Sequence, residues 1–164
     1  MKNILLIVFL SVLSVDVLCQ NTMNGLPFTL SPSLVAIQVS NIDSSEIWYK
    51  NSLGFALKDK KEFPDYGLKI SFLELNGFEL ELVENKKSIS RAELIKNYPK
   101  DSEIQGFAKL TFRVNNIDSA DTFLKKLGVK YLFNLQKSNI ANKENQKWLI
   151  VSDPDGKWIQ LVSE

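Results

Sequence analysis

Two stretches of this 164-residue chain carry the same order of strand, turn and helix signals. Residues 34–39 alternate as a strand does and lead through Asn-Ile-Asp into a helical pattern that ends at Gly54. Residues 109–114 lead through a second Asn-Ile-Asp into a helical pattern that ends at Gly128. In both copies we expect an Asp or Ser near the start to cap the helix, and the glycine to close it. Such a repeat predicts two copies of one structural module.

Three strand-like segments follow each helical pattern: 55–58, 68–75 and 78–83 in the first copy, and 130–135, 148–151 and 158–162 in the second. Asn76-Gly77 is a strong hairpin signal between the last two segments of the first copy. In the second copy, Asp153-Pro154-Asp155-Gly156 favours a β-turn over a calcium loop. The sequence therefore predicts an α+β fold of two βαβββ modules. Each sheet buries one face under a helix, and together the sheets form a curved eight-stranded cup.

The chain divides into five predicted parts. They are a signal peptide over 1–19, a linker over 20–32, the first module over 33–85, a connector with a short helix over 86–105, and the second module over 106–164. The connector is rich in charge and contains Pro99. Two further segments, 59–67 and 136–146, are expected to be loops that shape the cup.

The N-terminus has the pattern of an export signal. Lys2 precedes an apolar run over 4–13 that is too short to span a bilayer, and cleavage after Cys19 would leave a chain that begins at Gln20. We therefore expect a secreted or periplasmic protein. Lipidation of Cys19 is an alternative, although Leu18 is large for the residue before a lipidated cysteine. A structural role for this segment in the fold is a third interpretation, and membrane contact is expected only through the signal peptide or a lipid.

The chain contains no histidine, which excludes Ser-His-Asp triads, H-E-x-x-H helices and imidazole metal ligands. The single cysteine excludes disulfides within the chain and cysteine-based zinc sites. A formal net charge of +1 provides no general attraction for nucleic acid, and no G-x-G-x-x-G or P-loop supports a nucleotide site. We therefore expect no nucleic-acid partner and no cofactor.

Six short stretches together resemble a known superfamily. They are Val39-Ser40-Asn41-Ile42-Asp43, Trp48-Tyr49, Leu53-Gly54-Phe55, Phe112-Arg113-Val114, Asn116-Ile117-Asp118 and Asp153-Pro154-Asp155-Gly156. From about Ser33 to its end, the chain resembles the vicinal-oxygen-chelate superfamily, which includes glyoxalase I, extradiol dioxygenases and bleomycin-resistance proteins. The resemblance implies the same two-module fold.

The resemblance also implies a metal site of four side chains, with His or Gln on the first strand and Glu on the last strand of each module. Those positions hold Leu34, Glu81, Lys109 and Gln160. Only Glu81 is a strong ligand, because leucine has no donor atom, an ammonium group has no free lone pair and a glutamine offers a neutral amide oxygen. We therefore expect no structural or catalytic metal. If the four positions converge, Lys109 lies opposite Glu81 and replaces the ion electrostatically.

Strand alternation places polar and aromatic side chains on the faces that line the cup. The predicted ligand-binding residues are Gln38, Glu79, Glu81, Lys109, Thr111, Arg113, Trp158 and Gln160. Lys109 and Arg113 would bind a carboxylate or phosphate, or else neutralise the two glutamates. Glu81 is a weak candidate for a catalytic base, and Trp158 either stacks on a planar ligand or fills space. Gln38 stands where the resemblance to glyoxalase I implies an arginine, which argues against glutathione as the ligand.

These features favour an exported, metal-free member of the superfamily that binds a small organic molecule in its cup, or a partner on that surface. An anionic molecule is one option. The first alternative is a metal-dependent glyoxalase-like lyase or isomerase whose atypical site uses Glu81 and Gln160, alone or with a second chain. The other alternative is a drug-sequestering resistance protein, which predicts an acidic groove and a dimer. The sequence leaves both a monomer and a homodimer open.

Overall fold

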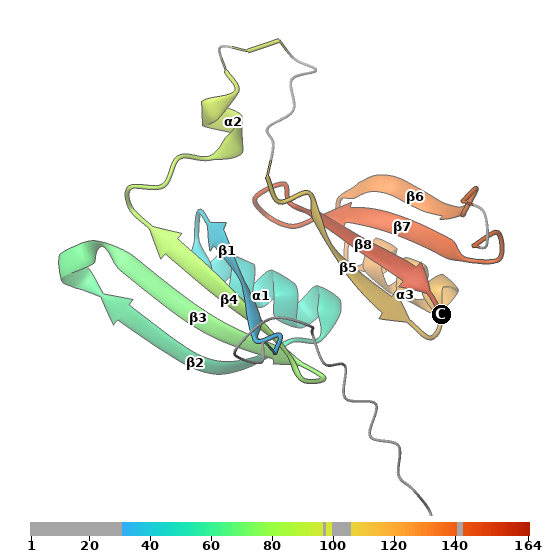
Figure 1. Ribbon diagram of the computed structural model, residues 1–164, viewed down its shortest axis with the longest axis horizontal. Coiled ribbons are helices and arrows are strands. Elements are labelled where there is room, and N and C mark those ends of the chain that lie inside the picture. Colours follow the sequence, from blue (N-terminus) through green and yellow to red (C-terminus); the bar gives the residue numbers. More distant parts are fainter. Residues whose placement is uncertain (1–30, 97, 100–105, 141–142) are drawn as a thin grey trace, which may run out of the picture. The chain divides into compact units, whose positions relative to one another are not determined.

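The computed structural model describes residues 31–96, 98–99, 106–140 and 143–164 (Figure 1). Contacts divide the chain into two units, Met1–Pro32 and Ser33–Glu164, and the second unit carries both modules. The predicted signal peptide and Cys19 lie outside the described residues. Within the described ranges, no helix is both long enough and apolar enough to cross a membrane.

The first module is a four-stranded sheet with one long helix. Its elements are β1 (Leu34–Val39), α1 (Ile42–Leu53), β2 (Ala56–Phe63), the short 3-10 helix η1 (Pro64–Tyr66), β3 (Leu68–Leu75) and β4 (Phe78–Asn85). The strands lie in the order β1-β4-β3-β2, with β1 parallel to β4 and the other pairs antiparallel. A parallel pair needs a long connection, and α1 with the two following strands provides it.

The second module repeats this arrangement. Its elements are β5 (Lys109–Val114), α3 (Ile117–Lys126), β6 (Tyr131–Lys137), β7 (Lys147–Ser152) and β8 (Trp158–Ser163), in the strand order β5-β8-β7-β6. The short helix α2 (Arg91–Leu94) lies in the connector, and its N-terminal amide at Glu93 donates to the Ser90 hydroxyl at 3.0 Å. The predicted α+β fold of two βαβββ modules is therefore confirmed, as two separate four-stranded sheets.

The helix caps differ from the prediction. Asn41 and Asn116 cap α1 and α3, and their side-chain oxygens accept hydrogen bonds from Ser44 and Ser119 at 2.8 and 2.9 Å. Asp43 and Asp118 lie inside the first turn instead, because Asn41 and Asn116 are the residues whose backbone is extended, as an N-cap requires. Gly54 closes α1 with a φ of 82°, as predicted.

Strand β2 corrects the prediction of a loop over 59–67. The chain stays extended to Phe63 and pairs with β3 along its length, and only η1 and Gly67 form the turn. All five residues from Lys58 to Glu62 are charged. An edge strand with both faces near water does not need alternating apolar residues, so the usual sequence signal of a strand is missing here. The predicted hairpin at Asn76-Gly77 is confirmed, with φ values of 51° and 81°.

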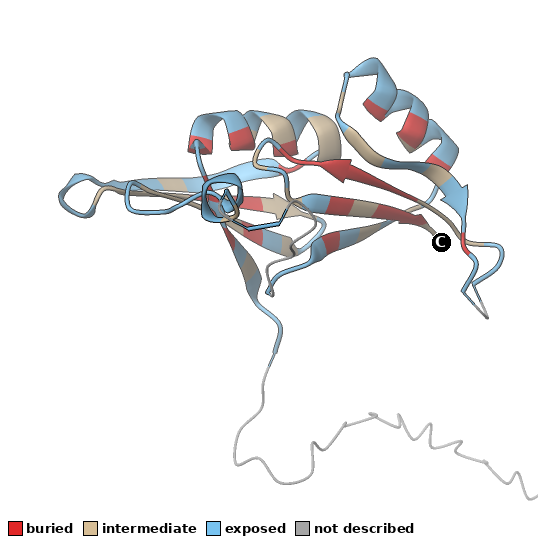
Figure 2. Cartoon of the chain, turned by 90° about the horizontal axis from the view of Figure 1, so that it is seen from above, coloured by how far each residue is buried: buried red, intermediate tan, exposed pale blue. Residues whose placement is uncertain are grey.

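The main core lies between each sheet and its helix. Figure 2 shows α1 and α3 on one side of the sheets, with buried residues, in red, on the parts of the helices and strands that face each other. Aromatic rings join the two modules here, since Phe112 of β5 contacts Phe55 and Phe78 with ring centroids 5.9 and 5.7 Å apart. We call the face of each sheet that is turned away from its helix the open face. The predicted ligand-binding side chains belong to these open faces.

Candidate functional site

Burial along the strands identifies the open faces. In β1 the exposed residues Leu34, Ala36 and Gln38 alternate with core residues such as Ile37, and β4, β5 and β8 show the same alternation. The side chains that alternate with the core on these four strands are the ones predicted to bind ligand. They are therefore arranged as two sets, one on each sheet.

The open face of the first sheet is acidic. Glu79 lies opposite Leu34, and Glu81 lies opposite Ala36, in the parallel pairing of β1 with β4. Leu34 and Glu81, two of the four predicted metal-ligand positions, are thus diagonal neighbours on one face. Among the described residues, the side chains of Glu79 and Glu81 have no hydrogen-bond or ion-pair partner.

The open face of the second sheet consists of three rows across β5, β8 and β7. The rows are Lys109–Trp158–Ser152, Thr111–Gln160–Ile150 and Arg113–Val162–Trp148. In the middle row the Thr111 hydroxyl donates a hydrogen bond to Oε1 of Gln160 at 3.2 Å. Lys109 and Arg113 therefore lie on either side of a polar pair, at the β5 edge of a face whose next strands are mainly apolar and aromatic.

The predicted ion pair between Glu81 and Lys109 is not formed. Glu81 is half-buried and Lys109 is exposed, and neither side chain has a charged partner in the described part of the chain. They lie on different sheets, whose direct contacts run through the turn before β8 and the aromatic rings near the helices. Because both groups keep water contact, neither requires an opposite charge to offset desolvation.

The four predicted metal-ligand positions do not fit a divalent ion. Leu34 is apolar, the ammonium of Lys109 repels a cation, and Gln160 offers only a neutral amide oxygen, which also accepts the Thr111 hydroxyl. Over the described ranges, no three His, Cys, Asp or Glu side chains lie close enough together to hold a metal. The donor chemistry of this chain therefore does not support the ion that the resemblance implies.

An aromatic cluster on the second open face was missed by the sequence analysis. The Phe133 ring lies 5.8 Å from Trp148 and 5.7 Å from Trp158, measured between ring centroids. Ile150 is only 4% exposed, although it lies outside the main core, because this cluster covers it. Register shifts on both sides of Phe133 turn its side chain to the open face, whereas Tyr131 reaches α3. The position of Trp148 on this face could have been predicted, because it lies two residues before Ile150 on the same strand. The position of Phe133 could not, because a β-bulge has no simple sequence signal.

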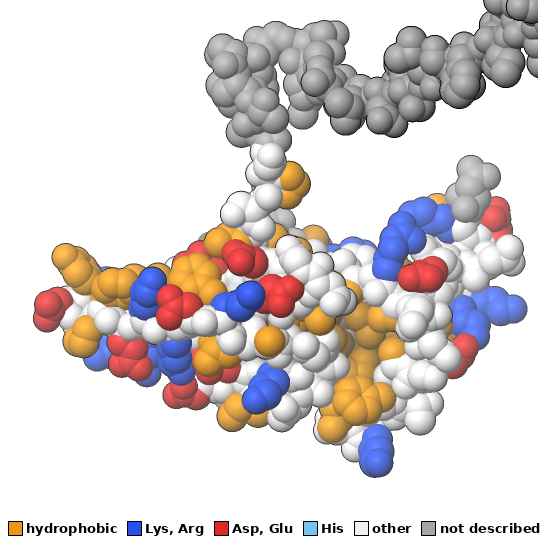
Figure 3. Space-filling view, turned by 90° about the horizontal axis from the view of Figure 1, so that it is seen from below, with side chains coloured by type: hydrophobic (Ala, Val, Ile, Leu, Met, Phe, Trp, Pro, Cys, Tyr) orange, Lys and Arg blue, Asp and Glu red, His pale blue; other side chains and the backbone are white. Residues whose placement is uncertain are grey.

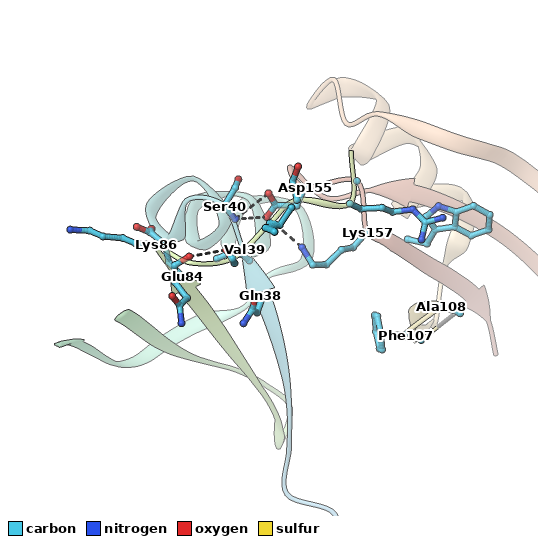
Figure 4. Close-up of a pocket in the computed structure, with 17 residues that line it drawn as sticks. Gln38, Val39, Ser40, Glu84, Lys86, Phe107, Ala108, Asp155 and Lys157 are labelled. Carbon is cyan, nitrogen blue, oxygen red and sulfur yellow. Dashed lines mark hydrogen bonds and ion pairs between the residues drawn. The ribbon is translucent and has the colours of Figure 1, made fainter. Parts of the chain in front are cut away.

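A cleft of about 780 Å³ lies where the modules meet. Figure 4 shows Glu84 of the first module at one end, Phe107 of the second at the other, and Asp155 between them. Of the predicted ligand-binding residues, Gln38 and Trp158 line the cleft, and the others lie on the open faces outside it. The lining residues fall in 38–40, 84–86, 88–91, 106–108 and 155–158.

The charge that this cleft offers to a ligand is positive. Glu84 already accepts the amide of Ile42 at 2.8 Å, and Asp155 accepts the amide of Ser40 at 3.1 Å. Each carboxylate also lies within ion-pair distance of a lysine. The lining cations without an acidic partner in the described part of the chain are Lys86 and Arg91. An anion would therefore be favoured here.

The predicted turn before β8 is confirmed and also fastens the modules together. The amide of Gly156 donates to the Asp153 carbonyl at 3.1 Å, which closes the β-turn. The Asp153 carboxylate is fully buried and accepts hydrogen bonds from the Tyr49 hydroxyl at 3.1 Å and the Lys157 amide at 2.7 Å. Burial raises the pKa of Asp153 above its ordinary value. Burial, together with the nearby Asp153 charge, also raises the pKa of Tyr49.

Comparison with known proteins agrees with this geometry. The sequence profile described as Glyoxalase/Bleomycin resistance protein/Dioxygenase superfamily matches residues 32–161. The chain is 28% identical over 142 residues to lactoylglutathione lyase of Schizosaccharomyces pombe, covering 78% of this chain and 45% of that protein. It is 26% identical over 98 residues to the mitochondrial methylmalonyl-CoA epimerase of Homo sapiens, covering 60% of this chain and 54% of that one. The chain thus spans about half the length of these curated relatives.

Solved structures share the two-module architecture. The glyoxalase family protein from Enterococcus faecalis has a TM-score of 0.67 and 25% sequence identity, over 80% of this chain and 96% of that chain. Glyoxalase I from Zea mays has a TM-score of 0.60 and 25% identity, over 79% of this chain and 44% of that chain. The chain therefore belongs to the Glyoxalase/Bleomycin resistance protein/Dioxygenase superfamily.

Proposed function

We propose that this protein binds a small organic molecule on the open face of its second sheet and in the adjoining cleft, without a catalytic divalent metal. One observation carries the proposal: the third metal-ligand position holds Lys109, whose ammonium group repels a cation, and the first holds Leu34. The open face next to Lys109 retains polar, cationic and aromatic side chains, which is the usual character of a small-molecule site.

The named relatives include a lyase and an epimerase, so an enzymatic role is the natural alternative. Such a role through a metal would require donors that this chain has replaced at three of the four positions, leaving Glu81. A drug-sequestering role that relies on an acidic groove would have to use the first open face, where Glu79 and Glu81 lie, because Lys109 and Arg113 are the charged groups of the three rows on the second. Non-catalytic binding of a ligand is therefore the function that the side chains support best.

Metal content tests this proposal directly. We expect the purified protein, after incubation with zinc, nickel or manganese and removal of free ion, to retain far less than one ion per chain. The physical reason is the donor set, so a variant with Leu34→His, Lys109→His and Gln160→Glu should gain zinc affinity. Inductively coupled plasma mass spectrometry measures both proteins, and circular dichroism checks that both are folded.

One tightly bound transition metal per parent chain would contradict the proposal and favour the lyase or isomerase. A parent without metal that also fails to bind small organic molecules in a thermal-shift screen would contradict ligand binding itself. The screen should contain anionic, neutral and cationic compounds of similar size, because the cationic compounds test the drug-sequestering alternative.

We also propose that the protein is exported through its N-terminal segment. Removal of residues 1–19 would take away Cys19 and leave a mature chain without cysteine. Expression of the full chain in a bacterial host is expected to yield an extracytoplasmic protein that begins at Gln20. Intact-mass spectrometry of the extracytoplasmic fraction measures this. A chain that keeps residues 1–19, or one with a lipid on Cys19, would overturn the proposed processing.

A further inference from the structure

Lys109 and Trp158 are direct neighbours on the second open face. They are paired residues of the parallel strands β5 and β8, which places their backbones about 5 Å apart. Both alternate with core residues, so both side chains leave the sheet on the same side. Trp158 remains 40% exposed and also lines the cleft between the modules. An indole ring and an ammonium group are therefore presented side by side on the open face, next to the cleft that Trp158 lines.

Among the described residues, Phe133 is the aromatic ring that packs against the indole of Trp158. Phe133 meets it edge-on, with the two ring planes 65° apart, and Phe133 is itself supported by Trp148. This packing covers Ile150, yet Phe133 and Trp158 each keep 40% of their surface exposed. Figure 3 shows hydrophobic side chains gathered at the surface among charged ones of both signs. The cluster therefore has more aromatic surface than is needed to cover the sheet beneath it.

The polar groups beside this ring are mainly donors. Lys109 and Arg113 have no acidic partner among the described residues, and the three rows contain no carboxylate. The Gln160 oxygen accepts the Thr111 hydroxyl, and the amide nitrogen of Gln160 offers two donors to a ligand. A ligand that fits this surface combines an aromatic ring with a negatively charged acceptor.

We propose that this face binds a planar aromatic carboxylate, with its ring against Trp158 and its carboxylate at the ammonium of Lys109. This inference rests on the proposed function and specifies its ligand class. The ring replaces water on the exposed indole, and the carboxylate forms a charge-assisted hydrogen bond with a lysine that has no other acidic partner in the described part of the chain. No bond is made or broken.

Three matched probes separate the contributions of ring and charge. They are 2-naphthoate, the neutral 2-naphthalenemethanol and the non-aromatic cyclohexanecarboxylate, each titrated into the full chain by isothermal titration calorimetry. We expect 2-naphthoate to bind at least about threefold more tightly than either of the others, because only it uses both groups. Equal affinity for 2-naphthoate and cyclohexanecarboxylate would overturn the role of the ring.

Substitutions assign each contribution to a side chain. Lys109→Gln should remove the preference for 2-naphthoate over the neutral alcohol, and Trp158→Leu should weaken both naphthalenes about tenfold. Lys126→Gln, at the end of α3 on the other side of the sheet, removes the same charge and should leave all affinities unchanged. An equal effect of Lys109→Gln and Lys126→Gln would show that only net charge matters, and would overturn the site.

The thermal-shift screen and the naphthalene titrations, carried out on the same full chain, distinguish this inference from the proposed function. If the thermal-shift screen finds other small molecules that bind while 2-naphthoate does not, the aromatic carboxylate is wrong and ligand binding stands. If neither the screen nor the naphthalenes show binding, both fail. Circular dichroism of each variant excludes loss of folding as the cause of any lost affinity.

Discussion

Asp153→Ala is expected to lower the free energy of unfolding by about 3 kcal/mol at neutral pH, since it leaves the buried Tyr49 hydroxyl and two partly buried amides without an acceptor. The carboxylate accepts the Tyr49 hydroxyl, 104 residues away in the chain, and the amides of Asp155 and Lys157. Its loss therefore releases both the turn before β8 and the contact of that turn with α1. Urea unfolding followed by circular dichroism measures the change.

Asp155→Ala is the matched control, because Asp155 is less buried and accepts the amide of Ser40 instead. We expect it to cost about 1 kcal/mol. Equal and small costs for Asp153→Ala and Asp155→Ala would show that the buried carboxylate does not hold the modules together.

The pH dependence of the same site has a defined sign. Burial raises the pKa of Asp153 above 3.8, so the folded protein binds its proton more tightly than the unfolded chain does. The stability that this group contributes is complete below pH 3.8 and is lost as the pH rises through the folded-state pKa. The stability of the parent relative to Asp153→Asn should therefore fall over this interval, because the other carboxylates titrate alike in both proteins. A difference that grows with rising pH would contradict this assignment.

Phe55→Ala is expected to lower the free energy of unfolding by about 3–5 kcal/mol, as truncations of buried aromatic residues do. Phe55 is 2% exposed, and its ring centroid lies 5.8 Å from that of Tyr49, 6.3 Å from Phe78 and 5.9 Å from Phe112. Because Phe112 belongs to the second module, the cavity would weaken both modules and the contact between them. The same denaturation experiment measures the loss.

Phe107→Ala provides the comparison, since Phe107 is exposed and should change the stability by less than about 0.5 kcal/mol. A double-mutant cycle of Phe55 and Phe112 isolates the ring contact between modules, for which we expect about 0.5–1.5 kcal/mol. If the interaction energy from the cycle falls below that range while Phe55→Ala alone is strongly destabilising, the loss of stability comes from the burial of Phe55 rather than from the contact between the rings.

Much of the fold was predictable from local pattern. The strands at 68–75 and 109–114 have the predicted bounds, and glycine closes α1 as expected. Alternation also placed the predicted ligand-binding side chains away from the core. The edge strand β2 was missed because its residues are mostly exposed, which removes the alternation on which a strand is recognised.

The candidate site was less predictable, because its geometry depends on how separate elements pack. Glu81 and Lys109 were expected to pair, yet they lie on different sheets without a contact. Phe133 was not expected on the open face, and it is there because a register shift in β6 reverses the direction of its side chain.

The order of polar and apolar residues is enough to predict two βαβββ modules, because strand and helix periodicities are local properties of the chain. Residue chemistry also predicts that three of the four positions that the family resemblance assigns to a metal lack a strong ligand. The buried bond between Tyr49 and Asp153, the three-ring cluster and the cleft beside Trp158 are decided only by the tertiary structure. Each depends on the register of a strand or the docking of one module on the other, and both are set by packing across the whole fold rather than by neighbouring residues.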